Sequence, residues 1–142
     1  MDISLVKNSN GQYDWNVSSG NLSLGDDLSS AILVSLLTYG RADDTHTTIP
    51  FNEKRGWWGS YLFSNMTFCQ YWTLFQMSID TTTLQLTLYN YTMQALQWLV
   101  SDGVVSSFNI TVTIISSSKA FIVINANKPD GNIETYSYVW NK

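Results

Sequence analysis

Few residues of this chain could perform acid–base or metal chemistry, and they are scattered. His46 is the only histidine, and it closely follows the carboxylates Asp43 and Asp44. An imidazole beside carboxylates can bind a metal ion or transfer a proton. The common zinc sites, however, need further His or Cys ligands, which are missing here. We therefore interpret His46 as an exposed loop histidine, and we predict no metal ion and no cofactor.

Two further candidates for catalysis have simpler structural explanations. Asp26 and Asp27 form a carboxylate pair directly before an apolar segment, where aspartates commonly cap a helix. Cys69 is the single cysteine and lies among aromatic residues without a basic neighbour, a setting typical of a buried and unreactive thiol. Because the sequence also lacks a Gly-rich phosphate loop and a serine elbow, we predict no catalytic residues.

The composition restricts the class of protein. A chain of 142 residues with 44% hydrophobic and 14% aromatic residues can form one compact domain. Its seven Lys and Arg against eleven Asp and Glu give a net charge of −4, which argues against binding through nucleic-acid phosphates. No apolar run approaches the roughly 20 residues of a membrane span, and the N-terminus does not resemble a signal peptide. We expect a single domain made in the cytoplasm, without nucleic-acid or membrane partners.

Ionised residues are nearly absent from the middle of the chain. Between Arg55 and Lys119 the only charged residues are Asp80 and Asp102. The segment therefore forms a deep core, or is covered by uncharged polar side chains, or is covered by another subunit. Protein interfaces have few charges and many aromatic residues at their centres, so the third explanation is as acceptable as the second.

The first part of the chain combines a hairpin signal with a helix signal. Alternating apolar residues around Asn10-Gly11 predict an N-terminal hairpin over residues 1–18. A helix is expected from Asp26 or Asp27 to about residue 38, apolar nearly all round and therefore buried on more than one side. The polar segment 41–55 is expected to be an exposed loop.

The remaining pattern predicts further helix followed by strands. The aromatic segment 56–77 suggests a turn and a short helix, and a longer amphipathic helix is expected from residues 80–83 to about 101, which closes a helical middle over 26–102. An alternating pattern over 105–140 predicts an antiparallel meander with a turn at Pro129-Asp130-Gly131. The expected fold class is α+β, with an antiparallel β-meander packed against two main α-helices.

The most distinctive motif is the pentapeptide Arg-Gly-Trp-Trp-Gly at residues 55–59. Together with four further motifs, it resembles the Mu-like phage gp46 family of contractile-tail baseplate proteins. These proteins are related in role to the gp25 wedge subunit of phage T4. The supporting motifs are Gly25-Asp26-Asp27-Leu28, Arg41-Ala42-Asp43-Asp44, Ala95-Leu96-Gln97-Trp98-Leu99-Val100 and Pro129-Asp130-Gly131. The chain departs from the family at Ser60, where Asp is usual, and in the uncharged segment 61–77, where basic residues are usual.

The resemblance implies a gp25-like fold and a structural role. The protein would be a wedge subunit that bridges neighbouring baseplate proteins of the gp6/J-like and gp53-like types and docks the first ring of tail sheath subunits. It would belong to the tail baseplate of the virion, be assembled in the host cytoplasm, and use no cofactor.

Two groups of residues are predicted to contact other subunits. Glycines on both sides of the paired indoles let the backbone turn and place both rings on one patch, and Trp and Arg are enriched in binding hot spots. We expect at least one ring to pack on the core, and Arg55 to pair with Asp43 or Asp44 or to stack on an indole. The terminal strand carries little charge and is the expected exposed sheet edge. The interface candidates are Arg55, Gly56, Trp57, Trp58, Gly59, Thr135, Tyr136, Tyr138 and Trp140.

Two other functions remain open on the sequence. Exposed indoles such as Trp57 and Trp58 could stack on sugars in a glycan- or receptor-binding tail module. A lysozyme-like hydrolase would need a carboxylate pair in a cleft, and the sequence shows no such pair. This alternative predicts an activity that is lost when Asp26 or Asp43 is replaced by Asn.

Overall fold

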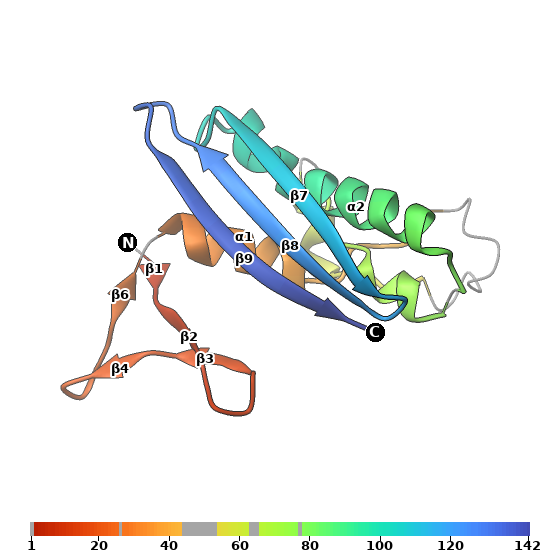
Figure 1. Cartoon of the computed structure of the whole chain (residues 1–142). Helices are drawn as coiled ribbons and strands as arrows, with labels where there is room; N and C mark the ends of the chain where they lie inside the picture. The colour runs from red at the N-terminus through yellow and green to blue at the C-terminus, as the bar shows by residue number, and fades with distance from the viewer. Residues whose placement is uncertain (1, 26, 44–53, 63–65, 77) are drawn as a thin grey trace. The chain divides into compact units, whose positions relative to one another are not determined.

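A computed structural model of the chain describes all residues except 1, 26, 44–53, 63–65 and 77 (Figure 1). Predictions made for Asp26, Asp44 and His46 therefore lie outside the described residues. The chain forms two compact units, Met1–Val34 and Ser35–Lys142. Antiparallel strands and two main helices confirm the expected α+β class.

Short strands build the first unit. They pair as β1 (Asp2–Ile3) with β6 (Leu24–Gly25), β2 (Leu5–Lys7) with β3 (Tyr13–Trp15), and β4 (Val17–Ser18) with β5 (Asn21–Leu22). The three pairs meet where Ser4, Asn16 and Ser23 exchange backbone hydrogen bonds of 2.7–2.9 Å. This unit is therefore a three-way junction of two hairpins and a closing strand pair.

The sequence predicted one of the two hairpin turns. The expected turn at Asn10-Gly11 is confirmed, with Gly11 at φ +79° and the Asn8 side chain accepting backbone hydrogen bonds. The second turn, at Ser19-Gly20, also has positive φ at both residues. We did not predict it because strands of two residues are too short to show an alternating pattern.

Helix α1 (Asp27–Leu37) confirms the first predicted helix. Its buried positions are spread around much of the circumference, as an apolar helix requires: Leu28, Ser30, Ile32, Leu33, Ser35 and Leu36. Val34 and Leu37 remain exposed. The C-terminal end of the helix belongs to the second unit, where the Ser35 hydroxyl accepts a 2.9 Å hydrogen bond from the Trp98 indole.

Helix α2 (Thr81–Ser101) confirms the second predicted helix, including its ends. The Asp80 carboxylate accepts hydrogen bonds from the backbone N–H groups of Thr82 and Thr83, which caps the N-terminus. A hydrogen bond from the Thr83 hydroxyl, at 2.6 Å, and these backbone hydrogen bonds lower the pKa of Asp80. Gly103, at φ +73°, ends the helix. Five members of the predicted apolar stripe are buried: Leu84, Leu88, Tyr91, Ala95 and Leu99. The sixth, Trp98, is half-buried, and Leu96 is buried in addition.

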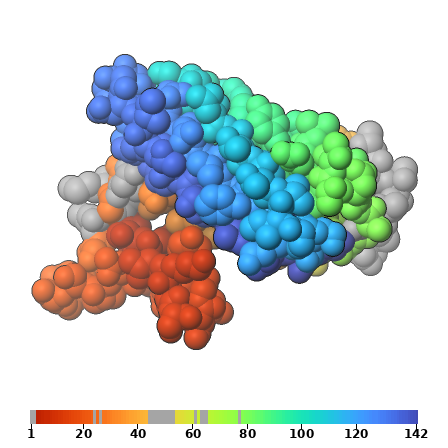
Figure 2. Space-filling view, viewed as in Figure 1, coloured from red at the N-terminus to blue at the C-terminus, as the bar shows by residue number. Residues whose placement is uncertain are grey.

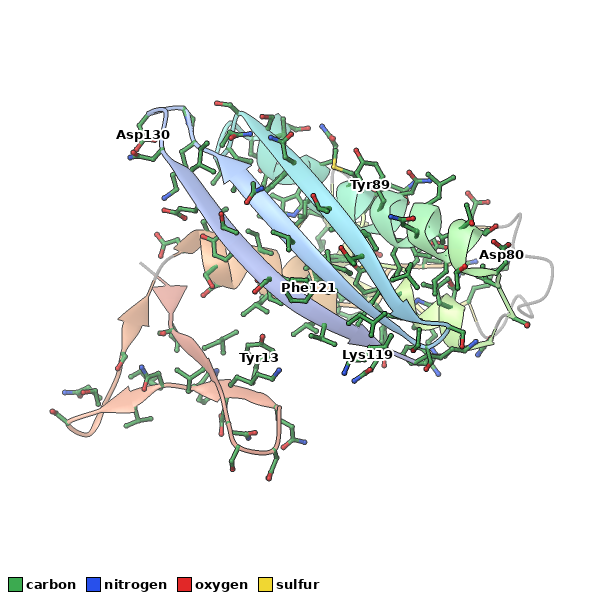
Figure 3. The ribbon with its side chains drawn as sticks, in the orientation of Figure 1. Tyr13, Asp80, Tyr89, Lys119, Phe121 and Asp130 are labelled. Atoms are coloured by element: carbon green, nitrogen blue, oxygen red, sulfur yellow. The ribbon has the colours of Figure 1, made fainter. Side chains whose placement is uncertain are left out.

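The C-terminal meander is a three-stranded antiparallel sheet in the order β7 (Ser107–Ser116), β8 (Lys119–Asn127), β9 (Ile133–Asn141). α2 packs against β7 (Figure 1). The register places Val112, Ile122 and Tyr138 on one face, which contains the buried side chains. The opposite face carries Phe121 and is open to solvent, as Figures 2 and 3 show.

Between the main helices the aromatic segment forms two short 3-10 helices, η2 (Trp58–Tyr61) and η3 (Tyr71–Gln76). This agrees with the expected turn and short helix, although neither is α-helical. None of the helices in the described part of the chain is both long and apolar enough to cross a membrane.

Candidate functional site

The first indole of the pentapeptide is packed. Trp57 is half-buried, and its ring meets Phe68 nearly edge-on at 5.3 Å between ring centroids. The ring also lies directly over Gly59, where a Cβ atom would come within 2.1 Å of it. Gly59 is therefore required by the position of Trp57, and the expectation that at least one ring packs internally agrees with the structure.

The second indole of the pentapeptide is exposed to solvent. Trp58 is 75% exposed, and its ring touches that of Trp57 at 5.4 Å between centroids. Trp58 begins the 3-10 helix η2. An exposed indole on a packed support costs little conformational entropy to immobilise, which suits a contact with another molecule.

Arg55 stacks on aromatic rings, as one of our two expectations proposed, but the rings differ from those of the pentapeptide. Its guanidinium lies over the rings of Tyr39 and Trp72, at 5.1 and 5.2 Å from their centroids. Arg55 forms no ion pair with Asp43, the other expected partner that the structure describes.

The rings of Tyr39 and Trp72 are held where two backbone segments cross at close range, at Gly40 and Cys69. Residue 39 forms a parallel bridge with Cys69, and the Gly40 N–H donates to the Cys69 carbonyl at 2.8 Å. The Trp72 indole donates to the Gly40 carbonyl at 2.8 Å. A Cβ atom at position 40 would lie 2.1 Å from the Phe68 carbonyl oxygen, so only glycine fits. The sequence suggested Gly40 only as a helix stop.

The expectation of an exposed loop over 41–55 holds for Arg41, Asp43 and Arg55, but it is wrong for Ala42 and Lys54. Ala42 is buried against Trp72, and its N–H donates to the Lys54 carbonyl at 3.1 Å. Lys54 is buried as well, and its ammonium donates to the Asp43 carbonyl at 3.1 Å. The polar composition of the segment misled the prediction because a lysine can be buried when backbone oxygens satisfy its charge.

Cys69 is buried, as expected. Desolvation raises the pKa of its thiol to about 12, against an ordinary value of 9.0. Burial also raises the pKa of Tyr71, whose hydroxyl pairs with that of Thr92. Both groups are therefore uncharged at neutral pH, and neither is suited to nucleophilic chemistry.

The second predicted group lies on β9, but its members differ in exposure. Thr135 is exposed, and its hydroxyl donates to Asn125 at 2.8 Å. Tyr136 and Tyr138 are half-buried, and the Tyr136 hydroxyl donates to Glu134 at 2.6 Å. Trp140 is buried, which excludes its side chain from a direct surface contact in this conformation.

The 3-10 helix η3 contacts both predicted groups of interface residues, the pentapeptide and the terminal strand β9. Trp72, in this 3-10 helix, stacks beneath Arg55, whereas Phe75 of the same helix packs on Trp140 at 6.1 Å between centroids. The pentapeptide and the terminal strand are thus attached to one short element. Sequence reasoning missed Tyr39, Phe68 and Trp72 as parts of this site, since only the backbone crossing at Gly40 brings them together.

Two open depressions lie on α2. A polar one of about 390 Å³ is lined, among the described residues, by Asp43, Thr67, Gln70, Met93, Gln94 and Gln97, none of which is aromatic. The other, of about 470 Å³, lies between α2 and β7 near Tyr89, which Figure 3 labels. Within the described ranges, no three His, Cys, Asp or Glu side chains come together as metal ligands would.

Comparisons with known proteins place the chain among phage proteins. The family model described as "Phage protein GP46" matches residues 28–133. The chain is 33% identical over 135 residues to the Mu-like prophage FluMu protein gp46 of Haemophilus influenzae, which covers 91% of this chain and 89% of that relative. It is 28% identical over 131 residues to baseplate protein gp46 of Escherichia phage Mu, again covering 91% and 89% of the two chains.

Proposed function

This chain belongs to the phage GP46 family, and from that premise we propose that it is a structural subunit of the baseplate of a contractile tail. In this role it occupies the wedge, bridges gp6/J-like and gp53-like neighbours, and docks the first ring of sheath subunits. It acts in the virion tail after assembly in the host cytoplasm. The role requires no cofactor and no catalytic step.

The observation that carries this proposal is the exposed indole of Trp58. A monomer that needed only a stable core would gain little from an indole that is 75% exposed beside one that is packed. Buried indoles supply much of the binding free energy at protein interfaces. We therefore assign Trp58 to the contact with a neighbouring wedge protein, with Trp57, Phe68 and Gly59 as its support.

The free edge of the sheet supports the sheath-docking part of the proposal. Among the described strands, β9 pairs only with β8. Its single charged residue, Glu134, is neutralised by an ion pair with Lys128. An edge with so little charge can accept a further strand. The other edge is less available, because α2 packs on β7 and the Gln85 amide donates to the Val112 carbonyl at 2.7 Å.

Replacing Trp58 by Ala tests the proposal. We expect W58A phages to lose about thirtyfold or more in infectious titre, because a hot-spot side chain contributes at least ~2 kcal/mol to its contact. Electron microscopy should show tailless or sheathless particles. The matched control is Leu86→Ala, which removes another exposed apolar side chain, on α2, and should leave assembly unchanged.

Normal W58A particles would overturn the wedge contact. If they assembled normally but failed to adsorb to cells, the exposed indole would instead serve glycan or receptor binding, and a glycan array with the purified protein would identify the sugar.

A further inference from the structure

Arg55 is held in an unusual backbone conformation. Its φ is +30°, and Gly56 follows at +135°. A non-glycine residue with positive φ is strained, and such strain persists where the surrounding structure enforces it, often at ligand-binding positions. Here the two residues turn the chain so that the Arg55 side chain lies over Tyr39 and Trp72.

The surface beneath Arg55 is rigid. The Trp72 indole is tied to the Gly40 carbonyl, and Tyr39 is fixed by the bridge to Cys69. Trp72 is buried and Tyr39 is half-exposed, so the guanidinium rests on a fixed ring on its inner side and reaches solvent on the other. The side chain is therefore preorganised before any partner arrives.

The guanidinium meets the two rings through cation–π contacts, which do not use its N–H groups as donors to an oxygen acceptor. A planar guanidinium carries five donors that match a carboxylate in a bidentate arrangement. No carboxylate among the described residues pairs with Arg55, although the chain has an excess of four acidic charges. By contrast, Lys128 is paired with Glu134. The cation at position 55 thus lacks a partner within the described part of its own chain.

We propose that Arg55 is a preformed receptor for an Asp or Glu side chain of a neighbouring baseplate protein. This inference rests on the proposed wedge function and adds the chemistry of the partner: an acidic residue that meets Arg55 beside the surface that Trp58 contacts. Charge complementarity specifies the partner, since an oriented guanidinium that pairs with no carboxylate among the described residues attracts a carboxylate and repels a basic segment.

The test is charge reversal in the phage. Arg55→Glu should lower the infectious titre by about a hundredfold or more, because loss of one member of an interfacial ion pair leaves the other charge unpaired. Arg55→Lys, which keeps the charge but loses the bidentate geometry, should lower it less. Lys119→Glu changes the net charge equally at another exposed cation on the sheet (Figure 3) and should assemble normally.

Selection of suppressors identifies the partner. Phages that regain titre in the Arg55→Glu background should carry an acidic-to-basic substitution in another baseplate protein. Suppressors confined to this chain would overturn the proposal, because they would indicate an internal role or contact with a second copy. A normal titre for Arg55→Glu would overturn it as well.

Thermal unfolding of the purified variants separates binding from folding. Arg55→Glu and Arg55→Gln should melt within about 5 °C of the unmodified protein, a shift equivalent to one modest contact. If both melted more than about 10 °C lower, Arg55 would be a structural residue and the proposal would fail. If Trp58→Ala blocked assembly while Arg55→Glu did not, this inference would fail and the wedge function would stand. Normal assembly of both variants would overturn both.

Discussion

Cys69 illustrates how burial alone sets the chemistry of a residue. Its thiol is buried and donates to the Tyr91 carbonyl at 4.0 Å, and its pKa rises to about 12 because the thiolate would be desolvated. In the unfolded chain the same thiol would titrate near 9.0. The folded state therefore favours the protonated form.

This difference predicts a loss of stability in alkaline solution. The contribution of Cys69 is fully present below pH 9 and is lost as the pH rises toward 12, because the unfolded chain releases its proton first. We expect the stability difference between the unmodified protein and Cys69→Ala to shrink above pH 9, by at most about 1.4 kcal/mol per pH unit. Urea unfolding of both proteins between pH 7 and 10.5 measures this stability difference. A difference that stays constant over this pH range would contradict the prediction. Tyr71→Phe is a useful second variant, since burial raises the pKa of Tyr71 in the same sense.

Gly59 and Gly40 show two ways in which the absence of a side chain shapes the site. Gly59 makes room for the ring of Trp57, whereas Gly40 makes room for the backbone at Phe68. Gly59 and Trp57 belong to the same pentapeptide, so the two residues of the first contact are neighbours in the sequence. The second depends on a segment nearly thirty residues away, so only the folded structure reveals it.

At the scale of elements, the two edges of the C-terminal sheet are not equivalent. β7 is accompanied by α2 and receives the Gln85 side chain, whereas β9 is the other edge and pairs only with β8 among the described strands. Edge strands are usually protected by charge or by covering elements. The asymmetry is the expected pattern if only one edge accepts a strand from the sheath.

Introducing lysines on the two edges tests this asymmetry. Ser137→Lys combined with Val139→Lys adds charge to β9 at exposed positions, and should produce tails that lack the first sheath ring, because edge lysines oppose strand addition. The matched control is Thr111→Lys with Thr113→Lys on β7, which should leave sheath assembly intact. Electron micrographs of the particles decide the question. Equal effects at the two edges would contradict a preference for β9.

For the molecule as a whole, the sparse and mostly acidic charge is the dominant property. The net charge is −4, and only Asp80 and Asp102 are ionised between Arg55 and Lys119. Such a surface associates through apolar and polar contacts and not through a strong electric field. Repetition around a tail axis would multiply modest contacts into a stable assembly.

The same charge predicts that the purified protein does not bind nucleic acid. Binding to phosphates depends on a basic face and on counterion release, and a chain with net charge −4 should give no mobility shift with duplex DNA at about 50 mM salt. A basic DNA-binding domain under the same conditions is the positive control. A salt-sensitive shift would contradict the exclusion of nucleic-acid partners.

The sequence by itself determined the family and the long regular elements. Both main helices and all three C-terminal strands lie where periodicity, the Asp80 cap and the Pro129-Asp130-Gly131 turn placed them, because these signals are local. The tertiary structure alone decided which aromatic rings support Arg55, that Lys54 is buried, and which indole is exposed. These features depend on the crossing of segments distant in sequence, and a side chain's burial and partners are set by that crossing and not by its immediate neighbours in the chain.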